Sequence, residues 1–156
     1  MNARPDMRPD KSRALDRCRA ILVARQTDYR RELASLDEAS AGETKSSAGD
    51  KYETAREMIA QSRRLLEGNL AAVDVSLETL ARMAAAPAQI RCGLGSLVET
   101  SSGWMLVGAS LGDVESEGTT IRTLSLASPL GQALKGRAAG ERLPWRGGEL
   151  LILSVS

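Results

Sequence analysis

The sequence predicts an α+β protein, in which an N-terminal antiparallel coiled-coil helical hairpin precedes a small β-rich domain with one short helix. Apolar residues recur at helical spacing on both sides of a Gly/Ser-rich break, and short strand-like runs follow Pro87. Aromatic residues make up only 3% of the 156 residues and Phe is absent. An elongated Ala/Leu-rich assembly is therefore expected rather than one large core.

The first helix is expected to begin near Asp10, because the apolar residues after it fall at steps of three, four or seven on one helix face. These residues are Leu15, Cys18, Leu22, Tyr29, Leu33 and Leu36. Arg25 occupies the position between Leu22 and Tyr29 where another apolar residue would be expected, which predicts a weak point in the seam. Glycine and proline are absent from this stretch until Gly42.

The break at residues 40–50 holds two glycines, three serines and no large apolar residue, which is typical of a turn. A second helical run starts near Asp50 and stops before Pro87, because proline cannot continue a helix. Its predicted seam consists of Ala55, Ile59, Ser62, Leu66, Leu70, Val73, Leu77, Leu80 and Ala84. Two helices of about 30 residues would each be ~45 Å long, and an antiparallel pair buries both seams.

The chain is accordingly divided into a disordered lead-in at 1–9, a hairpin at 10–87 with its tip at 40–50, and a C-terminal domain at 88–156. Four or five strands are expected in that domain, from runs such as Trp104-Met105-Leu106-Val107 that are separated by Gly and Ser clusters. One helix is predicted to interrupt the strands. Ser128 is a suitable N-cap, Pro129 suits the first helical position, and Gly136 can end the helix.

Composition argues against an enzyme with its own active site. Histidine is absent, which excludes Ser-His-Asp, Cys-His and His-zinc arrangements, and no catalytic residue or metal site is expected. Cys18 and Cys92 belong to no recognisable motif, and no cofactor is predicted. The formal net charge of +1 does not favour binding driven by phosphate neutralisation. Without a signal sequence or a long apolar run, the chain is expected to be a cytoplasmic protein without a membrane span.

Residues 128–136, Ser-Pro-Leu-Gly-Gln-Ala-Leu-Lys-Gly, are followed by Gly140-Glu141 and Gly147-Gly148. This segment resembles the C-terminal part of the Gre transcript cleavage factors, where it precedes the last strands of an FKBP-like domain. An N-terminal helical hairpin is also the Gre layout, so the resemblance covers nearly the whole chain. Residues 43–56 look like the tip of a small Gre-related group whose members sometimes carry the label 3-oxoacyl-ACP synthase. That label does not fit, because such condensing enzymes need histidine.

The resemblance implies a monomeric factor that binds RNA polymerase, with the FKBP-like domain at the rim of the secondary channel and the hairpin inside it. In Gre factors two acidic residues at the tip help to hold a Mg²⁺ ion at the polymerase active centre, so that backtracked RNA is cut. When Tyr52 is matched to the tyrosine of the Gre tip motif, the two acidic positions fall on Lys45 and Ala48. Neither side chain ligates a cation, so the resemblance supports polymerase binding rather than cleavage.

The predicted partner-binding residues at the hairpin tip are Glu43, Lys45, Asp50 and Glu53, and those in the C-terminal domain are Ser128, Pro129, Leu130 and Gly131. Asp50 and Glu53 keep an Asp-x-x-Glu spacing that would allow contact with the polymerase Mg²⁺ ion. The same spacing also fits a helix capping box, as Ser128–Gly131 fits a structural helix start. Modulation of transcription is therefore the first hypothesis, without sequence-specific binding to nucleic acid. A coiled-coil adaptor or self-associating protein is the alternative, and a direct stimulator of cleavage is the third.

Overall fold

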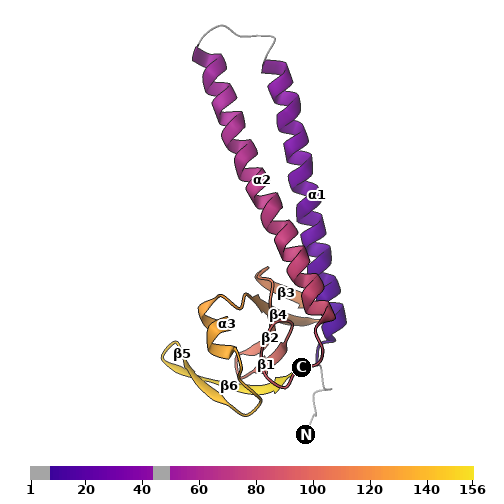
Figure 1. Ribbon diagram of the computed structural model, residues 1–156, viewed down its shortest axis with the longest axis vertical. Helices are drawn as coiled ribbons and strands as arrows, with labels where there is room; N and C mark the ends of the chain where they lie inside the picture. The colour runs from indigo at the N-terminus through magenta and orange to yellow at the C-terminus, as the bar shows by residue number, and fades with distance from the viewer. Residues whose placement is uncertain (1–7, 44–49) are drawn as a thin grey trace. The chain divides into compact units, whose positions relative to one another are not determined.

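The computed structural model describes residues 8–43 and 50–156, so most of the expected lead-in at 1–9 lies outside the described residues. The α+β prediction is confirmed, because two long antiparallel helices packed against each other precede a mixed sheet and one short helix (Figure 1). In chain order the elements are α1 (Lys11–Glu43), α2 (Asp50–Ala85), β1 (Leu97–Thr100), β2 (Gly103–Val107), β3 (Asp113–Ser116), β4 (Thr119–Leu124), α3 (Pro129–Leu134), β5 (Arg142–Trp145) and β6 (Gly148–Val155).

The chain divides into two units, each of which is described by itself. The first unit takes the described residues up to Ala20 together with Ser76–Ser156, and the second is Ile21–Val75. The start of α1 and the last turns of α2 therefore share a unit with the sheet. Asp10 caps α1, since its Oδ1 accepts a hydrogen bond from the backbone N–H of Arg13 at 3.0 Å.

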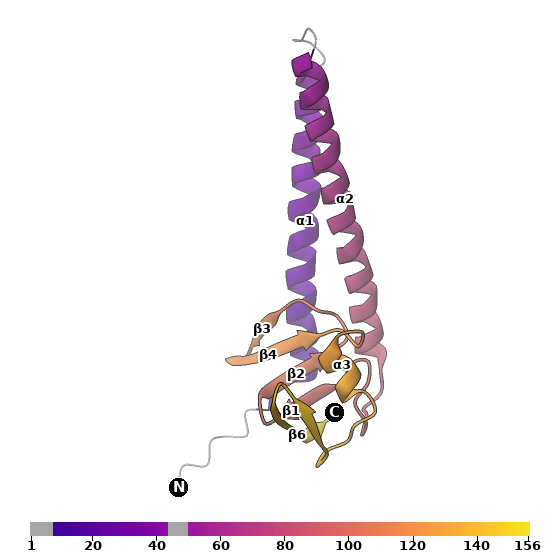
Figure 2. The same cartoon turned by 90° about the vertical axis from the view of Figure 1, so that its left-hand side faces the viewer.

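The sheet has six strands in the order β3-β4-β2-β1-β6-β5. Figure 2 labels β3, β4, β2, β1 and β6 in this order from top to bottom. β2 and β4 pair in parallel, and the other neighbours are antiparallel. The expectation of four or five strands was too low. The two edge strands, β3 and β5, are each four residues long. Four residues are too few for a clear alternation of apolar and polar residues, and β5 contains Pro144, which is tolerated at a sheet edge.

Helix α3 closes a hydrophobic core on one face of the sheet. Leu130 and Leu134 of α3 pack in a cluster of buried residues that also contains Cys92, Val98, Met105, Val107, Leu124, Leu143, Leu150 and Ile152. The predicted start of this helix is confirmed. The hydroxyl of Ser128 accepts a hydrogen bond from the N–H of Gly131 at 3.0 Å, and Pro129 is the first helical residue.

The last turns of α2 pack against the sheet through Met83, which is only 1% exposed. A Cβ atom at Gly108 would overlap the Met83 side chain, so this glycine permits the close approach of helix and sheet. The predicted seam placed Ala84 here instead, and that was wrong, because Ala84 is exposed. A step of three residues from Leu80 leads to Met83, whereas the sequence reading had used a step of four.

The predicted weak point at Arg25 was also misplaced by one residue. Arg25 is exposed, and Gln26 occupies the partly buried position between Leu22 and Tyr29. Gln26 donates a hydrogen bond from Nε2 to Oδ1 of Asp74 in α2 at 2.9 Å. The seam is therefore polar at this level, as expected, but a paired amide rather than an arginine makes it so.

Both cysteines are free and buried. Burial raises the pKa of the Cys92 thiol from 9.0 to about 11, although a hydrogen bond with Ser96 opposes the shift.

Because the thiolate is the reactive form, we expect Cys92 to resist Ellman's reagent at pH 8 in the folded protein and to react once guanidinium unfolds it. The folded state disfavours the thiolate form of Cys92. The contribution of the neutral thiol to the free energy of unfolding is therefore complete below pH 9 and is lost as the pH rises toward about 11. Equal labelling rates in folded and unfolded protein would contradict this account.

Candidate functional site

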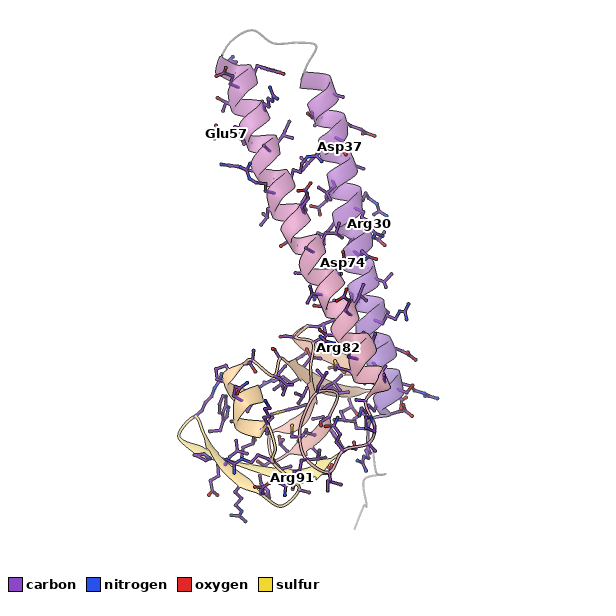
Figure 3. The ribbon with its side chains drawn as sticks, viewed as in Figure 1. Arg30, Asp37, Glu57, Asp74, Arg82 and Arg91 are labelled. Carbon is purple, nitrogen blue, oxygen red and sulfur yellow. The ribbon has the colours of Figure 1, made fainter. Side chains whose placement is uncertain are left out.

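Among the described residues, the polar contacts that join the helices of the hairpin unit include an ion pair and a hydrogen bond. Arg63 of α2 forms an ion pair with Asp37 of α1, and its other terminal nitrogen lies 3.8 Å from Glu67. The second contact is the hydrogen bond between Gln26 and Asp74. Figure 3 labels the acidic residue of each contact, Asp37 on α1 and Asp74 on α2. The Arg63 side chain is 38% exposed and reaches across to the other helix. Such partly exposed pairs contribute little free energy.

Apolar packing within the hairpin unit is sparse. In the described part of Ile21–Val75, the buried hydrophobic residues are Leu22, Leu66 and Val73. A groove of about 410 Å³ opens beside this seam, with Leu36, Leu65 and Leu66 as its apolar lining. Glu32 of α1 lies on the same groove. The helices are therefore joined by a narrow seam, with apolar surface still open beside it.

Helix α2 also exposes three large apolar side chains in this unit, Met58, Leu65 and Val75. Met58 is 63% exposed and Leu65 is 67% exposed, and they lie seven residues apart on one helix face. The sequence pattern predicted only one apolar seam on α2, so this exposed face was not expected. The seven-residue spacing of Met58 and Leu65, followed by Ala72, was the available signal for a second one.

The predicted tip residues lie at the adjoining ends of the two helices. Glu43 is the last residue of α1 and Asp50 is the first residue of α2, so the break is shorter than the predicted 40–50. Glu53 lies in the first turn of α2 and is exposed. Lys45 falls outside the described residues, and the side chains of Glu43 and Asp50 are likewise not described. The contact of Asp50 and Glu53 with a metal ion stays a prediction.

The four residues predicted to bind a partner in the C-terminal domain are adjacent, and each has a structural position. Ser128 caps α3, and Leu130 and Gly131 are buried. A Cβ atom at Gly131 would overlap the carbonyl oxygen of Ser125, so only glycine fits against this backbone. Pro129 is the exposed residue of the four, so a partner can reach its side chain directly. Their role in partner binding stays a prediction.

Within residues 8–43 and 50–156, no group of three or more His, Cys, Asp or Glu side chains is arranged to hold a metal ion. None of the helices in this part of the chain is long and apolar enough to span a bilayer. Comparison of the chain with family models, with curated proteins and with solved structures found no match.

Proposed function

We propose that this chain is a Gre-like factor that binds RNA polymerase, inserts its hairpin into the secondary channel and modulates elongation or initiation without supplying a cleavage site of its own. The observation that carries the proposal is the pair of antiparallel helices, 33 and 36 residues long, joined through residues 44–49. Helices of these lengths measure about 50 Å and 54 Å. A slender hairpin of this kind suits insertion into a narrow passage.

The α3 segment supports the same proposal from a different part of the chain. The resemblance to the Gre family is carried by residues 128–136, and the structural needs of the fold account for several of them. Ser128 caps the helix and Gly131 meets the backbone of Ser125. We also propose that the C-terminal domain is FKBP-like.

The residues at the hairpin tip argue against stimulation of RNA cleavage. Lys45 and Ala48 stand where the Gre pattern has its two acids, and neither coordinates Mg²⁺. Asp50 and Glu53 lie in the first turn of α2, where the positive end of the helix dipole stabilises negative charge. Their acidic side chains therefore also have a structural explanation. The protein is therefore expected to act by occupying the channel.

Competition for polymerase tests the proposal. The protein is expected to co-purify with core RNA polymerase and to be displaced by an excess of a known Gre factor, because both would occupy the same channel. Binding that survives the excess, or no binding to core polymerase, would contradict it.

A cleavage assay on backtracked complexes separates polymerase binding from stimulated cleavage. We expect the wild-type protein to leave backtracked RNA uncut, and Asp50→Ala and Glu53→Ala to behave like the wild type. Cleavage that the wild type stimulates and that both substitutions abolish would instead support the third hypothesis, in which these carboxylates contact the polymerase Mg²⁺ ion.

A coiled-coil adaptor is the second candidate, and the exposed Met58 and Leu65 favour it. Apolar side chains seven residues apart on a helix face are typical of a seam that packs against another helix. In that case the mass in solution should rise with concentration, or the hairpin should bind a partner other than polymerase. A monomer at all concentrations that binds polymerase would exclude self-association.

A further inference from the structure

The last turns of α1 receive little stabilisation from packing. Within residues 35–42 no side chain is buried, and only Leu36 and Ser40 are partly buried. No side chain of residues 51–65 in α2 is buried either. The first turns of α1, in contrast, bury Ala14, Leu15, Cys18 and Leu22. Because most of the stability of a helix in a protein comes from the packing of its apolar face, the end of α1 is less stable than its start.

The sequence of these turns also disfavours a helix. Ser35, Ser40 and Gly42 are poorer helix formers than alanine, because serine hydrogen-bonds the backbone in other conformations and glycine loses more backbone entropy. A Cβ atom at Gly42 would meet nothing within 4 Å, so no close contact requires glycine at this position. The residues at the end of α1 therefore neither pack tightly nor favour the helical state on their own.

Three acidic residues, Asp37, Glu38 and Glu43, lie toward the C-terminal end of α1, and its last turn contains no basic residue. The carbonyl groups at a helix C-terminus carry partial negative charge, so acidic side chains near it destabilise the helix. Arg63 of α2 compensates one of the three charges through its ion pair with Asp37. A cation that approaches from outside relieves the remaining repulsion.

We propose that residues 35–43 form an order–disorder switch: they unwind and refold in the free protein, and a protein surface rich in lysine or arginine holds them in the helix. The absence of buried side chains, the weak helix formers and the acidic residues at the negative end of the helix dipole all favour unwinding. A cationic surface binds the helical form better, because it interacts with the dipole as well as with the carboxylates. Unwinding of this segment shortens α1 by ~14 Å, so the reach of the hairpin depends on the partner. That consequence rests on the proposed function, whereas the unwinding itself does not.

Hydrogen exchange of the full chain in the absence of a partner, followed by NMR at low ionic strength, tests the switch. The amides of residues 36–42 are expected to exchange at least about a hundredfold faster than those of residues 15–22. Octalysine should slow exchange at residues 36–42 by about threefold or more, whereas octaglutamate should not slow it. Equal protection of the two ranges, or equal effects of the two peptides, would overturn the proposal.

Two substitutions shift the switch from within the chain. Gly42→Ala should slow exchange at residues 36–42 about fivefold, because alanine is the better helix former. Glu43→Lys should slow it about threefold or more, because it puts a cation at the negative end of the dipole. The control is Gly68→Ala, at an exposed glycine of α2 whose Cβ atom would also meet nothing within 4 Å, and it should change this exchange by less than about twofold. Unchanged exchange in both Gly42→Ala and Glu43→Lys, or an equal effect of Gly68→Ala, would contradict the switch.

Discussion

Replacement of Gly131 by alanine is expected to destabilise the protein by about 3 kcal/mol, which is a large share of the stability of a domain of this size. The new Cβ atom would overlap the carbonyl oxygen of Ser125 and press on the backbone of Leu126. Backbone atoms cannot move aside as a flexible side chain can, so α3 must shift. Chemical denaturation monitored by circular dichroism measures the change in the free energy of unfolding.

Gly68→Ala is the matched control for this prediction. Gly68 lies inside α2 and is exposed, and a Cβ atom there would meet nothing within 4 Å. Alanine at this position should stabilise the helix by about 0.5–1 kcal/mol, because glycine loses more backbone entropy when it becomes helical. Equal effects of the two substitutions would contradict the steric explanation for Gly131.

Truncation of Met83 to alanine should be nearly as damaging, at about 3 kcal/mol, because it opens a cavity where α2 packs against the sheet. Met83 is 1% exposed, and it lies where a side chain at Gly108 would have to be. For a chain of this length the loss corresponds to a fall in melting temperature of roughly 6–12 °C. Differential scanning calorimetry gives this value.

Met58→Ala supplies the comparison on the same helix. Met58 is exposed, so its truncation removes little buried surface and should change the stability by less than about 0.5 kcal/mol. A large loss at Met58 would mean that the exposed face of α2 is covered in solution. That result would favour the adaptor hypothesis.

The larger elements of the fold were predictable because their signals are repeated. The two helices carry several apolar positions each at helical spacing, and Ser128-Pro129 marks the start of α3 by two independent preferences. The errors lie where the signal depends on a single residue. Whether Arg25 or Gln26 faces the other helix, and whether Met83 or Ala84 does, turns on a step of three or four that periodicity alone does not decide.

The candidate surfaces were only partly predictable. The second helix was predicted to start near Asp50, as it does, whereas Glu43 was placed in the turn and is the last residue of α1. The Gre resemblance selected both residues for function. The groove beside Leu65 was not predicted, because the sequence pattern indicated a single apolar face on the second helix.

A cleavage reagent tethered to the hairpin tests the central proposal most directly. An iron chelate can be attached at Arg56→Cys, near the start of α2, because both native cysteines are buried. In complex with core polymerase, hydroxyl radicals from this position are predicted to cut polymerase chains that line the secondary channel near the active centre. The same chelate at Arg122→Cys in β4 should not cut there. Cuts from Arg56→Cys confined to the outer surface of a polymerase to which the protein is bound would contradict insertion of the hairpin.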